Sequence, residues 1–400
     1  MAANFNATLK TNEWNSALYN AYKVMGAKDN LSDLDDSLVG KIREEGGMFH
    51  DKNQYTFIDT VSSRDWDPTD TNLLAQEERP NVKQQEIAVK NKRQIAITKS
   101  YFLDKRAWGS PDSYAQYINL VDSQVSKCKK VYDHTFVNVG VGCMESSIGK
   151  QSQTITLPEA SQTATNVELE AINRITAQKI AERITNIRAE LRDPSTDYND
   201  LGFLDCYNDS KLTVIWNQSF LSKIDMLSLP TVYNDKYFDF NGIQLLGKYF
   251  GKKINESKTA DGLTHRALNE YKIKVGSDGK YSASGTTYKV IRPGELLPES
   301  TPIVSLTTDE TTSSLSVNTQ IFGKTTSITV TVYSTVHAYQ EDDTIICKIV
   351  SLDGLKYLSG FQTDGTFQNY KSNTSNIYST FMFSDVEYLG GYPFVTLRQA

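Results

Sequence analysis

The 400-residue sequence lacks most of the features that mark metalloproteins, redox proteins and membrane proteins. Its cysteines are few and far apart, without the CxxC or Cys/His spacing of a zinc site: Cys128, Cys143, Cys206 and Cys347. Its histidines have no Cys or Asp partner at a metal or catalytic spacing: His50, His134, His265 and His337. No run of eighteen apolar residues occurs, and no basic start leads into an apolar segment. We therefore expect reduced thiols, no metal site, no membrane-spanning helix and no cleavable secretion signal.

The sequence also lacks the loops that bind phosphates and the turns that carry nucleophiles. Neither GxxxxGK[ST], GxGxxG nor G-x-S-x-G is present, so we expect no cofactor. One carboxylate pair, Asp65 and Asp67 in "SSRDWDP", has the alternate spacing that metal sites or glycosidases use. Beside Trp66 and Pro68 the pair is typical of an exposed turn, and the sequence predicts no enzyme. A hydrolase that uses Asp65 and Asp67 stays an alternative.

Charge and composition indicate a globular protein with local charge clusters. The net charge is −6 and 39% of the residues are hydrophobic, which allows one large core or two to three smaller ones. An acidic balance argues against a protein whose whole surface binds nucleic acid.

A long hairpin is predicted in the first quarter of the chain. Residues Tyr55–Val61 form a candidate strand, a polar tip follows, and Glu86–Thr98 returns with alternating apolar residues. Its outgoing limb, residues 59–79, carries six acids and two bases, and residues 83–106 carry seven bases and two acids. Limbs of opposite charge favour docking between copies of the chain, although the charges can also neutralise each other within one hairpin.

A long helix follows the hairpin almost directly. Ser110 is a candidate cap, Pro111 suits the first helical position, and an apolar stripe from Tyr114 to Tyr132 predicts about six turns. Near its expected end, at about His134, stand three bases: Lys127, Lys129 and Lys130. They either complement the helix dipole or face nucleic acid, since phosphate contacts need only positive charge.

The remaining pattern alternates helix and strand. It predicts a helix over Asn166–Leu191 that ends at Asp193-Pro194, a buried strand at Leu212–Trp216, and a β-rich region from 253 to 340. Strand candidates in and after that region are Thr287–Ile291, Ser327–Val336, Thr344–Val350, Ile377–Leu389 and Phe394–Leu397.

This order of elements resembles the HK97-like fold of tailed-phage major capsid proteins, and most closely the small short-tailed, podovirus-like group. The residues that carry the resemblance are "YTFIDTVSSRDWDP" to "RQIAITKSYF" as extended loop, "SPDSYAQYINLVDSQVSKCKKVYDH" as spine helix, "SKLTVIWNQSFLSKI", and "IVSLDGLKYLSGFQ" with "NIYSTFMFSDVEYLGGYPF". The resemblance implies an α+β fold: an N-terminal arm (1–54), an extended loop (55–99), a peripheral domain (100–134 and 353–400) and an axial domain (135–352) with a β-rich insertion (253–340).

The resemblance also implies a function. The chain would be a non-enzymatic major capsid protein that assembles in the host cytoplasm into pentamers and hexamers of an icosahedral virion shell around double-stranded DNA. Its partners would be copies of itself and a portal protein, with or without a separate scaffolding protein, and it would have no membrane and no cofactor. No lysine of Lys90, Lys92 and Lys99 is marked as reactive, so we expect no covalent cross-link. The alternative is a carbohydrate- or receptor-binding virion appendage that uses residues 253–340.

The residues expected at subunit contacts are those of the charged hairpin: Asp65, Trp66, Asp67, Glu77, Glu78, Lys90, Lys92 and Arg93. Lys127, Lys129 and Lys130 are the candidates for facing the genome.

Overall fold

A computed structural model describes residues 37–63, 65–66, 79–100, 111–146, 148–158, 165–225, 242–321, 324–369 and 374–400. The chain divides into two units, of which the first holds residues 1–36, 94–131 and 363–380 and the second holds residues 37–93, 132–362 and 381–400. Most of the predicted N-terminal arm and the predicted cap Ser110 lie outside the described residues.

The second unit is built on a five-stranded sheet of order β5-β21-β17-β6-β7. Its strands are β5 (Ser152–Ile155), β6 (Leu212–Asn217), β7 (Ile243–Leu245), β17 (Ile345–Ser351) and β21 (Phe394–Gln399). Every residue of β17 is buried, which explains its nearly continuous apolar sequence "IICKIVS". The strands predicted near residues 212, 344 and 394 are confirmed.

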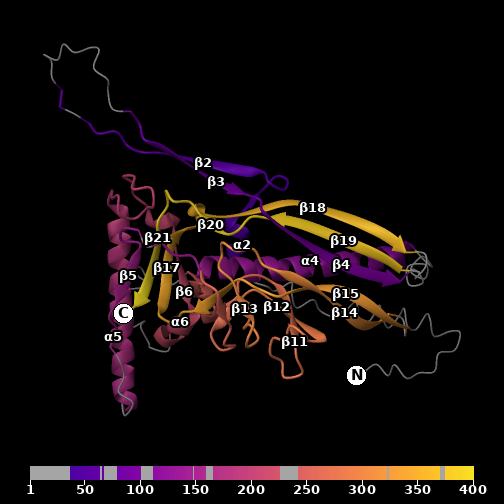
Figure 1. Cartoon of the computed structure of the whole chain (residues 1–400). Helices are drawn as coiled ribbons and strands as arrows, with labels where there is room; N and C mark the ends of the chain where they lie inside the picture. Colours follow the sequence, from indigo (N-terminus) through magenta and orange to yellow (C-terminus); the bar gives the residue numbers. More distant parts are fainter. Residues whose placement is uncertain are drawn as a thin grey trace. The chain divides into compact units, whose positions relative to one another are not determined.

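Helix α5 (Asn166–Arg192) packs on this sheet along its C-terminal half. Ile180, Ile184 and Ile187 recur at helical spacing and join one core with Trp216 of β6. The helix ends at Arg192 because Pro194 follows, as the sequence predicts. A shorter helix, α6 (Gln218–Asp225), follows β6 (Figure 1).

The predicted β-rich region is confirmed, and it holds a core of its own. Its strands are β8 (Gly251–Lys253), β9 (Lys258–Thr259), β10 (His265–Ala267), β11 (Tyr271–Val275), β12 (Thr287–Ile291), β13 (Pro302–Ile303), β14 (Thr312–Ile321), β15 (Lys324–Tyr333) and β16 (Ala338–Glu341). They form sheets of order β10-β16-β8, β12-β11-β15-β14 and β13-β9. Strand β14 was not predicted, because Ser and Thr hide its alternation.

A further sheet has the order β1-β18-β19-β4, with β20 paired to β18. Its strands are β1 (Arg43–Glu45), β4 (Asn91–Ser100), β18 (Leu355–Asn369), β19 (Thr374–Phe383) and β20 (Glu387–Tyr388). The predicted strand Ile377–Leu389 is therefore wrong as one element. It is divided by Ser384, whose hydroxyl accepts from the backbone N–H of Leu358.

The predicted hairpin is present, but its return limb is two strands and not one. Strand β2 (Lys52–Ile58) pairs with β3 (Val82–Ala88), and the chain then passes to β4 in the other sheet. The chain changes sheets just after Val89. There the His50 N–H donates to the Val89 carbonyl, and the Val89 N–H donates to the Asp51 carbonyl. The prediction joined Ile87 and Val89 with Ile95 and Ile97 into one strand, although five polar residues, 90–94, separate the two pairs.

The short helix α2 (Ser37–Ile42) precedes strand β1. The long helix α4 (Pro111–Gly142) comes after strand β4 and extends eight residues beyond its predicted end at His134. The extension fits closely against neighbouring segments. A Cβ at Gly142 would lie 2.1 Å from the Tyr249 carbonyl oxygen, and one at Gly140 would lie 2.7 Å from Val386. The domain boundary expected at 134–135 therefore falls inside a continuous helix.

No described helix is long and apolar enough to cross a membrane. Within the same described residues, no three His, Cys, Asp or Glu side chains are grouped as metal ligands.

Candidate functional site

Hairpin β2–β3 has one face turned to the protein and one turned to solvent. Its strands pair from Lys52 with Ala88 to Ile58 with Val82. Ile87 on the inner face belongs to a core cluster with Leu358 and Leu389, against which Tyr55 and Phe57 pack. On the outer face Lys52 forms an exposed ion pair with Glu86 at 2.7 Å. The alternation of the two faces follows from the period of two in a strand.

The hairpin is clamped along its length by hydrogen bonds. The Gln85 side chain donates to the Tyr388 carbonyl at 2.9 Å and accepts from the Gly390 backbone N–H at 2.9 Å. Farther out, the Lys83 ammonium donates to the Leu201 carbonyl at 2.8 Å. The Asp59 carboxylate accepts from the backbone N–H of Leu204 at 3.2 Å. These contacts fix the direction in which the hairpin leaves the core.

The hydroxyl of Tyr55 adds a half-buried polar contact at the base of the hairpin. It donates to the Glu44 carboxylate at 2.6 Å, and Glu44 also binds Lys356. Burial and this bond raise the pKa of Tyr55 to about 12. Burial opposes ionisation of Glu44, but the hydrogen bonds from Lys356 and Tyr55 lower its pKa. A charged, paired carboxylate therefore holds the hairpin base on strand β18.

At the outer end of the clamp and beyond it, apolar side chains face solvent. The exposed fractions are 68% for Ile58, 48% for Val82, 49% for Val61 and 87% for Trp66. We call these four residues the tip patch. Several exposed apolar side chains along the outer part of a clamped arm are typical of a surface that contacts another protein.

The end of helix α4 is capped in an unexpected way. The Lys348 ammonium, fully buried on β17, donates to the carbonyls of Val141, Gly142 and Met144 at 3.0, 2.6 and 2.6 Å. These carbonyls have no partner within the helix, and a cation there also suits its dipole. Burial lowers the pKa of Lys348 to about 7. The only sequence signal for this role is one lysine inside the apolar run "IICKIV".

The dipole interpretation of Lys127, Lys129 and Lys130 is wrong. Helix α4 continues twelve residues past Lys130 and has no basic residue in its last turn. Dipole effects fall off within the last turn, so these lysines are too far from the helix end to act on it.

The sequence matches the model of a phage protein family over residues 12–381. The chain belongs to the Phi29-like phage major capsid protein family. Among solved structures, the capsid of Staphylococcus phage Andhra has a TM-score of 0.54 at 9% identity, over 94% of this chain and 87% of that one. A structure of the head fiber and inner core protein gp22 of native bacteriophage P68 has a TM-score of 0.47 at 9% identity, over 89% of this chain and 83% of that one. The Andhra match shows a shared HK97-like capsid fold. No curated protein matches the sequence.

The protein is thus a structural, non-enzymatic component of a tailed-phage virion, whose copies assemble into the capsomers of the icosahedral shell. The predicted family and function are confirmed, and the appendage and hydrolase alternatives are not supported.

The expected contact residues of this capsid protein are either exposed, outside the described residues or, for Arg93 alone, bonded within the chain. Asp65, Trp66, Lys90 and Lys92 are exposed. Asp67, Glu77 and Glu78 lie outside the described residues.

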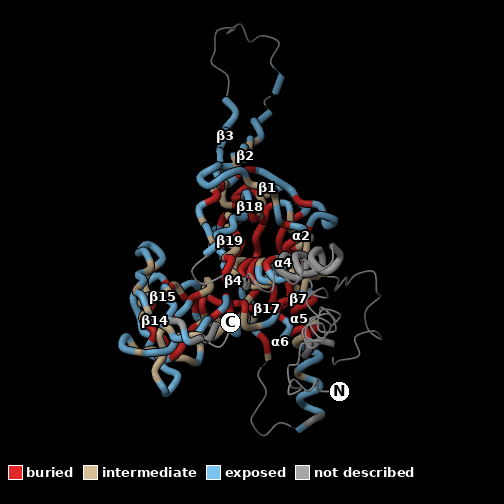
Figure 2. The backbone as a smooth tube through the Cα atoms, turned by 90° about the vertical axis from the view of Figure 1, so that its right-hand side faces the viewer, coloured by how far each residue is buried: buried red, intermediate tan, exposed pale blue. Residues whose placement is uncertain are grey.

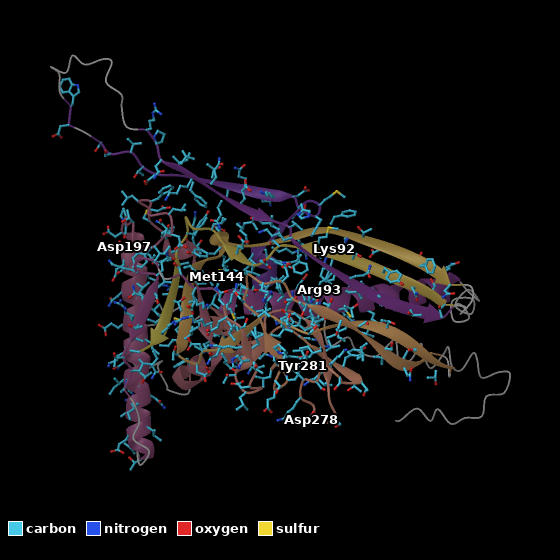
Figure 3. All side chains as sticks on the ribbon, in the orientation of Figure 1. Lys92, Arg93, Met144, Asp197, Asp278 and Tyr281 are labelled. Atoms are coloured by element: carbon cyan, nitrogen blue, oxygen red, sulfur yellow. The ribbon has the colours of Figure 1, made fainter. Side chains whose placement is uncertain are left out.

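Arg93 is used within the chain. Its guanidinium donates to Asn269 Oδ1 at 2.9 Å and lies 4.6 Å from the ring centroid of Tyr132. Lys92 and Arg93 are adjacent on β4, so they point to opposite faces (Figure 3). Arg93 is therefore an internal positioning residue, and we remove it from the contact candidates.

Proposed function

We propose that hairpin β2–β3 is the arm by which each capsid protein reaches a neighbouring copy, in pentamers and hexamers that enclose double-stranded DNA. The observation that carries the proposal is the contrast between a clamped base and an exposed apolar tip. Four hydrogen bonds fix the direction of the arm, while Trp66 at its end is 87% exposed. A rigid arm loses little conformational entropy on docking, so more of the contact energy contributes to assembly.

Trp66 is the residue of the tip patch that we expect to matter most. Tryptophan buries the largest area of any side chain and is enriched among residues that dominate interface energies. Ile58 and Val82 are direct cross-strand partners, and they provide exposed apolar side chains nearer the hairpin base. Together these residues form the core of the contact, and the charged residues around them form its rim.

Charge supports a copy of the same chain as the partner. The outgoing limb is acidic, and exposed Lys90 and Lys92 follow the hairpin. We propose that Asp65, with Asp67, Glu77 and Glu78, approaches Lys90 and Lys92 of a neighbour. Complementary charge raises the association rate and selects the register of the contact.

The domain division belongs to this proposal with one change. We assign 1–54 to an arm, 55–99 to an extended loop, 100–142 with 353–400 to a peripheral domain, and 143–352 to an axial domain with a β-rich insertion. The boundary moves from 134 to 142 because α4 is one helix. We further propose that Lys127, Lys129 and Lys130 face packaged DNA, and that a portal protein, with or without a scaffolding protein, completes the assembly.

The test is Trp66→Ala, with Leu263→Ala as a matched control. Leu263 is 78% exposed on a loop of the β-rich region, so both changes remove an exposed apolar side chain. We expect Trp66→Ala subunits to unfold at the wild-type temperature but to form few shells by electron microscopy and light scattering. Leu263→Ala should assemble normally. Normal shell yield and shell stability for Trp66→Ala would refute the role of the arm.

A further inference from the structure

A second candidate contact surface lies on the β14–β15 hairpin. The two strands pair over ten consecutive residue pairs without a shift in register, from Thr312 with Tyr333 to Ile321 with Lys324. Only one pair, Ile273 with Tyr333, joins β15 to its other neighbour β11. Among the strands that the structure describes, most of this hairpin, which we call the ribbon, therefore has no third partner. Such a two-stranded element is at best marginally stable by itself.

The two faces of the ribbon differ sharply in chemistry. The register places Leu315 opposite Val330 and Val317 opposite Ile328 on one face. Ile328 is 41% exposed, and the other three are only partly buried. The opposite face pairs Ser and Thr side chains, as in Ser316 with Thr329. The ribbon is thus amphipathic, and its apolar face is incompletely covered by its own subunit. Figure 2 colours most of β14 and β15 as exposed or intermediate.

The ribbon also lacks the charges that normally protect exposed strands. From Thr312 to Tyr333 the sequence contains a single charged residue, Lys324. Soluble proteins guard open strands with charges, bulges or proline, since an unguarded apolar strand pairs with other chains. The β2–β3 hairpin of this same protein does carry such charges, at Lys52, Lys83 and Glu86. The near absence of charged residues on the ribbon indicates a surface that is covered in the assembled protein.

We infer that the apolar face of the β14–β15 ribbon docks on a second copy of this chain within the shell. The capsid function supplies the occupant, because every subunit in a closed shell has copies of itself on its sides. Such a contact joins two different surfaces of neighbouring copies, and it closes into a ring when the rotation between copies allows. The inference rests on membership of the capsid family and not on the proposal for the tip patch.

The decisive pair of variants uses adjacent residues on opposite faces. Ile328→Asp places a charge on the apolar face, and Thr329→Asp places the same charge on the polar face. We expect Ile328→Asp to leave thermal unfolding of the unassembled full-length subunit unchanged and to reduce shell yield about tenfold or more, since a desolvated, unpaired charge opposes association. Thr329→Asp should assemble as the wild type does.

Hydrogen exchange supplies a second measurement that needs no substitution. Amides of residues 312–333 should exchange about tenfold more slowly in wild-type shells than in free subunits, because docking suppresses opening of the ribbon. Equal exchange rates in the two states would overturn the inference. Unfolding of the Ile328→Asp subunit would also overturn it, because the face would then belong to the subunit core. Normal shell assembly by Ile328→Asp would overturn it as well. This holds even if the variant shells adsorb poorly to the host, because the apolar face would then serve another contact.

Discussion

At the scale of single residues, the most informative side chain is Lys348. A lysine is almost never fully buried without compensation. Here the compensation is three carbonyl groups at the end of helix α4, together with the rings of Phe394 and Phe250 at 5.4 and 5.8 Å from the ammonium. One strand residue thus ties β17 to the end of a helix that is two hundred positions away in sequence.

Replacement of this lysine should weaken the subunit. Lys348→Met keeps the length of the side chain but removes the ammonium donor from three buried carbonyls, of which only that of Val141 keeps another donor, the Met144 N–H at 3.4 Å. We expect a loss of about 3 kcal/mol in the free energy of unfolding, measured by denaturant titration of unassembled subunits. Lys52→Met is the control, because Lys52 forms only an exposed ion pair and its loss should have little effect. A change as small for Lys348→Met as for Lys52→Met would contradict the capping role.

The same variant should alter the dependence of stability on pH. Burial lowers the pKa of Lys348 from its usual 10.5 to about 7, so between these values the unfolded chain holds a proton that the folded chain has released. The contribution of this pKa shift to the free energy of unfolding is therefore complete above the pKa of Lys348 in the unfolded chain, and it is lost as the pH falls to about 7. The unfolding free energy of the wild type should rise with pH across this window relative to that of Lys348→Met. Parallel curves would show that the group does not titrate there.

At the scale of elements, helix α5 combines a buried half with an exposed one. Its first turns are exposed, with Val167 at 77% and Ile175 at 45% (Figure 2). They begin with a reciprocal capping box, in which the Thr165 hydroxyl accepts from the Glu168 N–H and the Glu168 carboxylate accepts from the Thr165 N–H. Local capping therefore supports the part of the helix that packing does not.

Loss of this cap should fray the helix locally without unfolding the protein. Thr165→Ala removes the side-chain acceptor, and amides of residues 166–175 should exchange about fivefold faster, because a cap affects the first turns directly. Thr185→Ala is the control, since Thr185 lies in the same helix and its hydroxyl donates to the Ala181 carbonyl. A drop in the global unfolding temperature, with no local change in exchange, would argue against this account.

Elements with local signals were the ones that the sequence predicted well. Helix α5 was bounded correctly because Pro194 ends it, and strand β17 because a short apolar run lies between polar residues. The end of α4 was missed because residues 135–142, "TFVNVGVG", are mostly β-branched residues and glycines of low helix propensity, and this segment is held by Lys348 and by contacts with Tyr249. Such long-range partners leave no periodic mark in the chain.

The candidate contacts were predictable only in part for the same reason. The charge asymmetry of the hairpin is visible in sequence, and it led to Trp66, Lys90 and Lys92. The partners of Arg93 within the chain, Asn269 and Glu270, could not be predicted because they come from a distant segment. Of the ribbon, only strand β15 was predicted. Strand β14 was not, since a Ser/Thr-rich face weakens the contrast between apolar and polar positions on which strand prediction depends.

At the scale of the whole molecule, a shell is stable because each subunit makes several modest contacts at once. When one contact has formed, the next is effectively intramolecular, so weak surfaces give strong assembly in combination. The tip patch and the ribbon are two such surfaces on one chain. Each single substitution should therefore reduce the yield of shells while leaving the fold of the subunit intact.

The electrostatic part of the proposal predicts a change of sign in the effect of salt. Salt screens exposed charges over about 10 Å at 0.1 M, so it should slow wild-type assembly by weakening the attraction between the acidic tip and Lys90 with Lys92. In Lys90→Glu/Lys92→Glu the same contact becomes repulsive, and salt should accelerate assembly. Light scattering at increasing salt would measure both slopes.

The matched control is Lys272→Glu/Lys274→Glu, which has the same spacing on β11 and the same change in net charge. It should retain the wild-type slope, because those lysines are outside the proposed contact. An identical slope for all three proteins would show that salt acts on the net charge of the subunit. A reversed slope for the Lys90 and Lys92 variant alone would place the attraction at the end of the hairpin, because the control changes net charge equally.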